Sequence, residues 1–357
     1  MVPGDYTGAL ETPRGGDGVL RISLKLRFGT MRSFSRLAFA AEELGLDGVW
    51  LSEPWGYDAT SLLGWLSAKT SRVLIGTHVL SVYSRTPAAF AGLAASLQVA
   101  SDGRFRLGLG TSGPQVVEGW HGVPFERPVD LTADIVAIVR QALRGEVVEH
   151  SGRAVTLPRP GGPGKALPFA GLREPITVPI YLAAAGDRNL RLTANTADGW
   201  IPFPWSPESA STYGGVLEAA LADRDQALAP LAIAPSGSVA FGDVAELRDL
   251  ERTTIAFYLG AMGTGEQNFY VSAVARMGFG EQARQVQERW RSGDRAGARE
   301  AIPDELIDQV TLFGGADTVR ARLDEYRRAG VDELVVDLRR RDTESQLADL
   351  RRLVELL

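Results

Sequence analysis

The alternation of short apolar runs with amphipathic stretches predicts an α/β fold, a (β/α)8 or TIM barrel. Eight such strand–helix units can be counted in the 357 residues, a length that suits one large domain. Several strands are apolar on both faces, as buried parallel strands are. A doubly wound open sheet explains the same alternation, but the number of units favours the barrel. We expect residues 19–357 to form this single domain, after a flexible Gly/Pro-rich extension over 1–18.

The first four units follow one another closely. Their strands are expected at four short apolar runs, 20–26, 48–52, 73–80 and 105–109. The helix after the first strand repeats its apolar residues at helical spacing and ends at Gly45, and Pro87 opens the helix after the third. Helix and strand signals therefore alternate without a linker through the first 145 residues.

The pattern breaks after Gly145. Residues 146–177 are rich in Gly and Pro and contain one hairpin-like piece, and because the alternation then resumes we interpret them as an insertion after the fourth helix. The remaining strands are expected at 180–184, 199–203, 231–241 and 333–338. The stretch from about 243 to 330 predicts extra helices between strands seven and eight.

The composition narrows the classes of function. Cys is absent, so disulfides, thiolate metal sites and cysteine nucleophiles are excluded, and a cytoplasmic location is compatible. No apolar run approaches the roughly 18 residues of a membrane span, so no membrane association is expected. The net charge of −6 is spread along the chain without a basic block, so we expect no nucleic-acid partner. Neither a GxSxG elbow nor a Walker loop is present, which removes serine hydrolases and P-loop enzymes.

Chemistry in such a barrel lies at the carboxyl ends of the strands, so the residues there are the candidates. Glu53 follows the second strand and is the best-placed carboxylate. His78 ends the third and is a candidate catalytic acid, because imidazole titrates near neutrality. A structural role for a single histidine is the alternative. His121 and His150 are far from His78 in sequence, so no metal site is expected.

Aromatic residues gather around the same predicted rim. Trp55, Tyr57, Trp120, His121 and Phe203 are candidates for the substrate side of a pocket. Core packing explains each of the aromatic side chains equally well at this point. Titratable groups, Gly-rich turns and aromatics on one rim are what a pocket for a cofactor and a substrate requires.

A GxGxxG sequence, Gly108, Gly110 and Gly113, follows the fourth strand. Alone it is a weak signal for dinucleotide binding. Pro114 comes directly after the third glycine, the unit is fourth rather than first, and we expect no apolar helix to begin at once. We therefore interpret the sequence as a barrel loop in which glycine lets the backbone approach a flat ring.

Three small residues, Ala184, Ala185 and Gly186, lead into a predicted helix start at Asp187. Free N–H groups at a helix N-terminus bind anions, so a phosphate could lie here. Asp187 is a good N-cap, but its charge would repel a phosphate, and Arg188 could offset it. A simple structural turn explains these residues as well.

Several blocks of sequence resemble one known family. They are Tyr83–Pro87, Ser101–Phe105, Leu107–Gly122 (LGLGTSGPQVVEGWHG), Ile180–Trp200, Tyr258–Tyr270 (YLGAMGTGEQNFY) and Pro303–Leu306. Over roughly residues 20–340, in one register, the chain resembles the luciferase-like monooxygenase superfamily. Within it, the blocks resemble the branch of oxidoreductases that use the deazaflavin coenzyme F420, including methylenetetrahydromethanopterin reductase.

The resemblance implies a barrel with the deazaflavin in its mouth and a non-prolyl cis peptide between His78 and Val79. The implied cofactor-binding residues are Thr77, His78, Val79, Gly110, Thr111, Ser112, Ala184, Ala185, Gly186 and Arg188. The implied reaction is hydride transfer between the deazaflavin C5 and a small molecule or modified peptide, with C=C or C=N reduction in natural-product metabolism as one form. His78 or Glu53 would supply the proton.

Departures from the family pattern leave alternatives open. His78 stands where relatives usually have a small residue, Asp187 where they often have Pro, and the acidic residue that some carry in the fourth loop is missing. An FMN-dependent monooxygenase and a non-catalytic cofactor-binding barrel are the alternatives. Relatives are often homodimers. Arg159, Lys165 and Arg173 of the insertion could reach the acidic tail of the cofactor, or belong to a plain surface loop.

Overall fold

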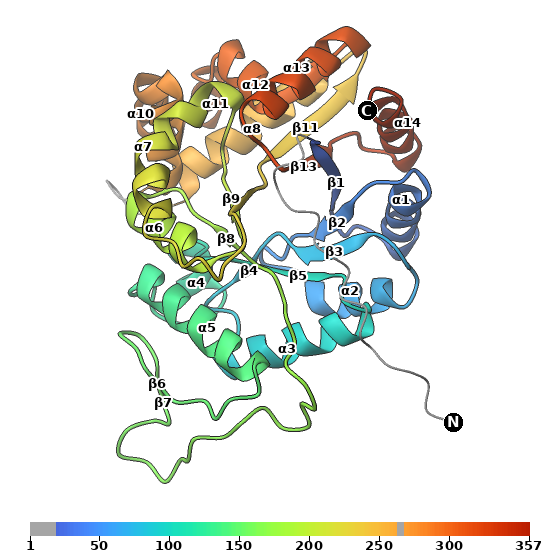
Figure 1. Ribbon diagram of the computed structural model, residues 1–357. Coiled ribbons are helices and arrows are strands. Elements are labelled where there is room, and N and C mark those ends of the chain that lie inside the picture. The colour runs from blue at the N-terminus through green and yellow to red at the C-terminus, as the bar shows by residue number, and fades with distance from the viewer. Residues whose placement is uncertain (1–18, 263–267) are drawn as a thin grey trace.

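The computed structural model describes residues 19–262 and 268–357, so the predicted extension over 1–18 lies outside the described residues. Parallel strands form a central sheet, and helices surround it (Figure 1). The strands are β1 (Arg21–Leu26), β2 (Gly48–Leu51), β3 (Leu74–Thr77), β4 (Leu80–Ser81), β5 (Phe105–Gly110), β8 (Ile180–Ala183), β9 (Gly199–Ile201), β10 (Ala232–Ile233), β11 (Ser236–Phe241) and β13 (Glu333–Leu338). Each pairs in parallel with its neighbours in the order β10-β9-β8-β5-β3-β2-β1-β13-β11, and β4 continues β3 along β5.

The sheet closes through residues 232–241. Within this segment β10 pairs with β9 and β11 pairs with β13. Between them the Ala234 N–H donates to the Trp200 carbonyl at 2.8 Å, and the Val335 N–H donates to the Pro235 carbonyl at 2.9 Å. The segment is therefore one strand in two pieces, and it joins the two ends of the sheet. The predicted barrel is confirmed.

Helices cover the outside of the barrel (Figure 1). Those that follow the expected units are α1 (Met31–Glu43), α2 (Ala59–Ser67), α3 (Pro87–Ala100), α5 (Pro128–Leu143), α6 (Asp187–Thr196), α7 (Ala210–Leu221), α13 (Ala316–Arg328) and α14 (Thr343–Val354). The extra helices between strands seven and eight are α8 (Ala245–Ala261), α9 (Phe269–Val274), α10 (Gly280–Arg291), α11 (Arg295–Glu300) and α12 (Asp304–Val310), with their own apolar cluster. None of the described helices is long and apolar enough to cross a membrane.

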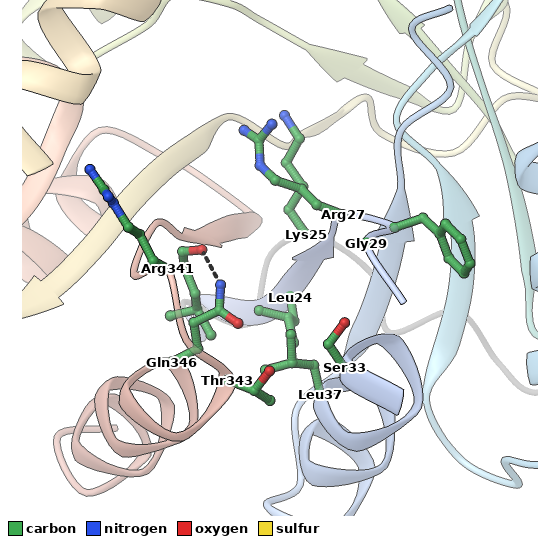
Figure 2. A pocket seen from close by; sticks show the side chains of 11 residues that line it. Leu24, Lys25, Arg27, Gly29, Ser33, Leu37, Arg341, Thr343 and Gln346 are labelled. Atoms are coloured by element: carbon green, nitrogen blue, oxygen red, sulfur yellow. Dashed lines mark hydrogen bonds between the residues drawn. The ribbon is translucent and has the colours of Figure 1, made fainter. Parts of the chain in front are cut away.

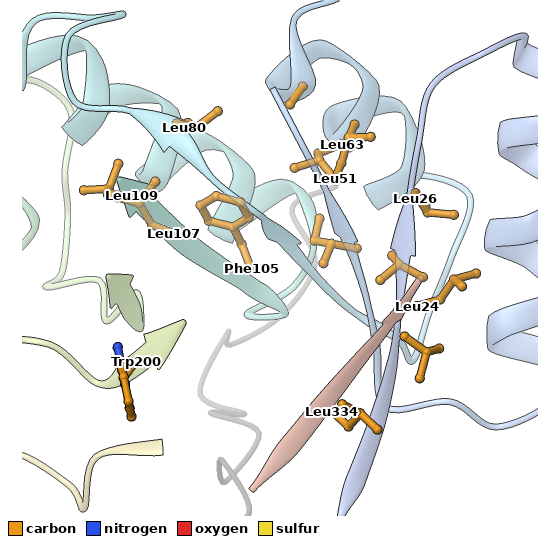
Figure 3. Packing of buried hydrophobic residues seen from close by; sticks show 14 of the residues in the cluster. Leu24, Leu26, Leu51, Leu63, Leu80, Phe105, Leu107, Leu109, Trp200 and Leu334 are labelled. Carbon is orange, nitrogen blue, oxygen red and sulfur yellow. The ribbon is translucent and has the colours of Figure 1, made fainter. Parts of the chain in front are cut away.

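The main core lies between the sheet and the helices. Successive side chains of a strand point to opposite faces, so Leu24 and Leu26 of β1 face outward while Ser23 and Lys25 face the barrel interior. Figure 3 shows Leu24, Leu26 and Leu51 with the leucines of β5 in this layer. Apolar burial on the outer face thus leaves the inner face of the strands free to carry polar groups.

Two local predictions are wrong. A strand, β12 (Thr311–Gly314), pairs with β11 inside the stretch that we expected to be helical. Because β9 and β10 pair over only two residues, the far end of β11 has an open edge, and β12 supplies its hydrogen bonds. A short helix, α4 (Pro114–Gly119), also begins directly after Gly113, where no helix was expected at once. Its start is typical, because proline is favoured at the first helical position.

The insertion contains the predicted hairpin, an antiparallel pair of β6 (His150–Ser151) and β7 (Thr156–Leu157). It packs on α5, where the Asp134 carboxylate accepts the Ala154 N–H at 2.7 Å and the Val155 N–H at 2.8 Å. His150 Nε2 lies 2.9 Å from the same carboxylate. His150 therefore holds the hairpin against the barrel.

Candidate active site

A cavity of about 890 Å³ lies at the carboxyl ends of the barrel strands. Beneath it, toward the amino ends, the barrel interior is filled by Trp50, Arg106, Tyr181 and Glu333, all of them buried. The Glu333 carboxylate accepts hydrogen bonds from Trp50 Nε1 at 2.7 Å and Arg106 at 2.6 Å. Burial alone would raise the pKa of Glu333, but the neighbouring guanidinium groups and these hydrogen bonds hold it below its usual value. A charged floor, joined by these hydrogen bonds, thus closes the cavity from below.

One side of the cavity, which we call the bulge wall, is formed by Val79, Gly110 and Ala183 on β3 to β8. The His78–Val79 peptide is cis, as the family resemblance implied. A Cβ on Gly110 would lie 2.7 Å from Val79 Cγ2, and one on Gly108 would lie 1.9 Å from the Thr77 carbonyl oxygen. Only glycine allows this approach, so the side chains of this wall are limited to the small ones of Val79 and Ala183.

The predicted ring-binding residues divide into two groups. Val79, Gly110, Thr111 and Ser112 line the cavity. Thr77 is buried and does not line it: its hydroxyl donates to the Gly108 carbonyl and accepts the Gly108 N–H, both at 2.8 Å. Thr77 therefore joins β3 to β5 behind the wall.

The N-terminus of α6 opens at one end of the bulge wall. Ala184, Ala185, Gly186 and Arg188 all line the cavity. The N-cap is Gly186 rather than Asp187, and no side chain caps the helix. Asp187 forms an ion pair with Arg276, and Arg188 forms one with Asp130. The charge of Asp187 is thereby compensated, and uncapped N–H groups remain available to an anion.

Glu53 lines the cavity but is held by other groups. Arg85 donates to both of its carboxylate oxygens, at 2.6 and 2.9 Å, and the Ala59 N–H donates to one of them at 2.8 Å. The side chains of Glu53 and Arg85 are 12% and 18% exposed. This carboxylate fixes the loop after β2 to the start of α2.

His78 also lines the cavity and is buried, with its ring edge toward Trp50. Its Nε2 atom has no hydrogen-bond partner among the described residues. Burial and the nearby charge of Lys25 lower the pKa of His78 to about 3. The ring is therefore neutral at neutral pH, and the ordinary imidazole pKa, which suggested His78 as an acid, does not hold here.

The aromatic candidates are also divided. Trp55 and Phe203 line the cavity. Tyr57 is 66% exposed and packs against the Phe28 ring at 4.5 Å, and Trp120 is 64% exposed. Neither of these, nor His121, belongs to the cavity lining. Sequence position near a strand end does not distinguish a rim residue from one that points into the mouth.

Opposite the bulge wall lies a charged wall that the sequence analysis missed. It consists of Lys25 on β1 and Arg27 directly after it, Asp337 on β13 and Arg339 directly after it, Ser238 on β11 and Glu251 on α8. Lys25 is in register with Asp337, which is in register with Ser238, so the three face the interior at one level. Figure 2 shows Lys25 and Arg27 extending together from β1, beside a second cavity of about 200 Å³ between α1 and α14.

Ion pairs and hydrogen bonds connect the members of the charged wall. Arg27 Nε donates to Asp337 at 3.0 Å, and the nitrogens of Arg339 lie 3.6 Å from Asp337 and 3.4 Å from Glu251. The Ser238 hydroxyl donates to Glu251 at 2.6 Å. Burial would raise the pKa of the Asp337 carboxyl, but Arg27 and its other cationic neighbours hold it well below its usual value. Burial raises the pKa of Glu251.

Asn268 explains one of the sequence blocks. Its amide donates to the Leu259 carbonyl at 2.8 Å, and its carbonyl accepts the Tyr270 N–H at 2.9 Å. It thus links the end of α8 to the start of α9, and Tyr258 and Tyr270 line the cavity from these helices. The middle of the block, 263–267, lies outside the described residues.

The basic residues of the insertion lie elsewhere. Arg159, Lys165 and Arg173 are exposed, and none lines the cavity. The hairpin meets the rim at another residue, where Arg127 donates to the Arg153 carbonyl at 2.7 Å. Across 19–262 and 268–357, no group of three or more His, Asp or Glu side chains could hold a metal ion.

Comparison with known proteins assigns the chain to a family. The family model described as luciferase-like monooxygenase matches residues 12–333. The chain belongs to the luciferase-like monooxygenase family. The family resemblance drawn from the sequence blocks is thereby confirmed.

Individual relatives within the luciferase-like family are similar over most of the chain. A putative coenzyme F420-dependent oxidoreductase of Mycobacterium tuberculosis is 37% identical over 90% of this chain and 94% of its own. A 5,10-methylenetetrahydromethanopterin reductase of Archaeoglobus fulgidus is 26% identical, covering 83% and 86%. The solved coenzyme F420-dependent tetrahydromethanopterin reductase of Methanopyrus kandleri superposes with a TM-score of 0.73 at 21% identity, covering 93% and 97%. This last similarity supports the fold.

Proposed function

We propose that this protein is a coenzyme F420-dependent oxidoreductase that transfers hydride between C5 of the deazaflavin and a small organic substrate. The observation that carries the proposal is that the bulge wall, with only small side chains, and the uncapped N-terminus of α6 line the same cavity. A deazaflavin cofactor has both a flat ring and a phosphate. The ring would bind at the bulge wall and the phosphate at the N-terminus of α6. The identity to the mycobacterial relative supports the choice of cofactor.

The residues present fit such a cofactor. Val79, Gly110 and Ala183 leave room for a ring, and a Cβ on Gly110 would already disturb the wall. A phosphate fits at Gly186, where a Cβ would meet nothing within 4 Å, and Arg188 supplies a positive charge beside it. When bound, the deazaflavin supplies a two-electron hydride donor or acceptor.

The other residues of the cavity would bind and orient the substrate. Trp55, Phe203, Tyr258 and Tyr270 give it an aromatic side, and Phe203 and Tyr258 pack edge to face with ring centroids 5.0 Å apart. These rings exclude water from the space next to the bulge wall. The proposed substrate is a small molecule with a C=C, C=N or C=O group. The proposal also includes that the enzyme is a homodimer in the cytoplasm.

Ligand titration tests the proposal. Purified protein is titrated with coenzyme F420 and, separately, with FMN while tryptophan fluorescence is followed, since Trp55 lines the cavity. We expect saturable quenching by F420 and no comparable response to FMN. Tight binding of FMN without a response to F420 would refute the proposal.

A matched pair of variants locates the phosphate. Arg188→Ala removes the positive charge beside α6, and we expect about ten-fold weaker F420 binding, a typical cost of one charge-assisted contact. Arg320→Ala is the control, because Arg320 is likewise an exposed arginine paired with an aspartate, on α13. Equal F420 affinity of the two variants would place the phosphate elsewhere.

A further inference from the structure

One cation of the charged wall, Lys25, has no hydrogen-bond or ion-pair partner among the described residues. Asp337 and Glu251 engage Arg27 and Arg339, as described above, and three cations face only two carboxylates. The Lys25 ammonium forms no hydrogen bond with any of the described residues, although its side chain is only partly exposed. Buried polar groups are normally paired, and leaving one unpaired costs free energy of folding. An unpaired ammonium that faces a cavity is therefore available to a ligand.

Of the titratable side chains near the charged wall, Lys25 is the one best able to donate a proton to a ligand. The neighbouring His78 ring is neutral, as shown above, and Arg27 and Arg339 keep their protons at any physiological pH. Glu53, the other candidate, is already engaged by Arg85 and the backbone. Lys25 lines the cavity from β1, on the side of the barrel opposite the bulge wall.

We propose that Lys25 is the acid–base residue of this enzyme, that it exchanges a proton with the oxygen of a carbonyl or α,β-unsaturated carbonyl substrate, and that Asp337 positions it. The proposal rests on the proposed function, because the cofactor supplies the hydride. In reduction, the substrate carbon accepts the hydride, the π electron pair moves to oxygen, and oxygen takes a proton from Nζ. Lys25 is left as a neutral amine and regains its proton from water; oxidation runs the same steps in reverse.

The charges around Lys25 suit this role. Burial is the largest of the effects that lower the pKa of Lys25, Arg27 and Arg339 add to it, and Asp337 and Glu251 oppose it, so that the pKa is about 8. An ammonium with such a pKa is protonated at pH 7 and still gives up its proton readily, as general acid catalysis near neutrality requires. Asp337, in register on the neighbouring strand, favours the charged form of the ammonium through its own negative charge.

The chain contains only three lysines, Lys25, Lys69 and Lys165, so each can be followed separately. Protein labelled with ¹³C at lysine Cε is titrated by NMR, and we expect the Lys25 signal to titrate near pH 8, with the signals of the exposed Lys69 and Lys165 as internal references. Phenol, a stable mimic of an enol oxygen, should shift the Lys25 signal alone, with or without cofactor. An unresponsive Lys25 signal would overturn the subsite.

Turnover tests the catalytic step. With F420H2 bound, cyclohex-2-enone is mixed in and oxidation of the cofactor is followed in a single turnover. We expect Lys25→Met to slow it by at least 100-fold at pH 7, the usual size of a general-acid contribution, with F420 affinity unchanged. The wild-type rate should fall as pH rises through about 8, and the variant should lose this limb. Lys69→Met is the control with wild-type behaviour.

Lys25→Arg separates proton transfer from charge alone. Arginine keeps the positive charge but does not release a proton, so we expect no rescue of the rate. Rescue by arginine, an unchanged pH profile in Lys25→Met, or no oxidation by cyclohex-2-enone despite bound F420 would each overturn the proposal. Absence of F420 binding by the wild type would instead refute the proposed function, while the phenol shift needs no cofactor.

Discussion

The bulge wall and the charged wall belong to the same barrel but are built from opposite kinds of residue. The bulge wall has only small side chains, so its backbone determines its shape. The charged wall presents long ionised side chains that hold one another in place. Both use inward-facing strand positions, which the outer apolar core leaves free. The difference teaches that one barrel can present two unlike surfaces to one cavity: under the proposals above, the bulge wall would bind the cofactor ring and the charged wall would supply the proton.

The largest expected effect comes from adding a side chain to the bulge wall. Gly110→Ala brings a Cβ to 2.7 Å from Val79 Cγ2. We expect F420 binding to weaken about 100-fold, equivalent to about 2.7 kcal/mol, measured by fluorescence titration. Gly92→Ala is the control, since a Cβ on Gly92 meets nothing within 4 Å. F420 affinity within two-fold of wild type would show that the ring does not lie on this wall.

The second effect is an acid sensitivity that originates in His78, where the two walls meet. Its pKa is about 3 in the folded protein and about 6.5 when unfolded, so the unfolded state binds the proton first as pH falls below 6.5. The free energy of unfolding should drop by about 2 kcal/mol between pH 7 and pH 5 from this residue alone. Urea unfolding at both values measures it, and His78→Leu should flatten the difference. An equally steep change in His78→Leu would contradict this origin.

The third effect shows that the charged wall costs stability. The pKa of Lys25 is about 8 when folded and about 10.5 when unfolded, so the charge is unfavourable to folding below pH 8 and the cost disappears as pH rises toward 10.5. Lys25→Met should raise stability at pH 7 by about 1.5 kcal/mol, half the full linkage value because the cavity hydrates part of the side chain. Thermal unfolding at pH 7 and pH 10 checks the gain and its loss. A variant less stable than wild type at pH 7 would mean that the wall is structural.

The smallest effect concerns Glu53, which the sequence suggested as an acid. Its ion pair with Arg85 predicts that Glu53→Gln costs about 1 kcal/mol of stability, the value of a partly exposed pair. Single-turnover oxidation of F420H2 by cyclohex-2-enone should slow less than ten-fold. A loss as large as that of Lys25→Met would move the proton source from the charged wall to the loop after β2.

The barrel was predictable because its signal is carried by outward-facing residues. Apolar runs such as 20–26 and 105–109 mark strands wherever they lie in space. The sequence analysis did not predict β12. Its four residues, Thr311–Gly314, lie between two helices and are extended because they pair with the open edge of β11. Tertiary pairing of that kind leaves little trace in local sequence.

The cavity was predictable where backbone defines it and not where side chains reach it from neighbouring strands. The glycines at 108 and 110 and the helix start at Asp187 mark the bulge wall in the sequence itself. Lys25 was missed although a signal exists: polar residues occupy every second position of β1, opposite its leucines. Its relation to Asp337, more than 300 positions away, requires the closed barrel.

The packed floor of Glu333, Arg106 and Trp50 has a consequence for how ligands enter and leave the cavity. Because these groups block the amino ends of the strands, the proposed cofactor and its substrate would both have to enter and leave at the carboxyl ends. Whichever of the two lies deeper has to arrive first and depart last. For a cofactor and a substrate that bind one beneath the other, the closed floor thus requires an ordered binding mechanism.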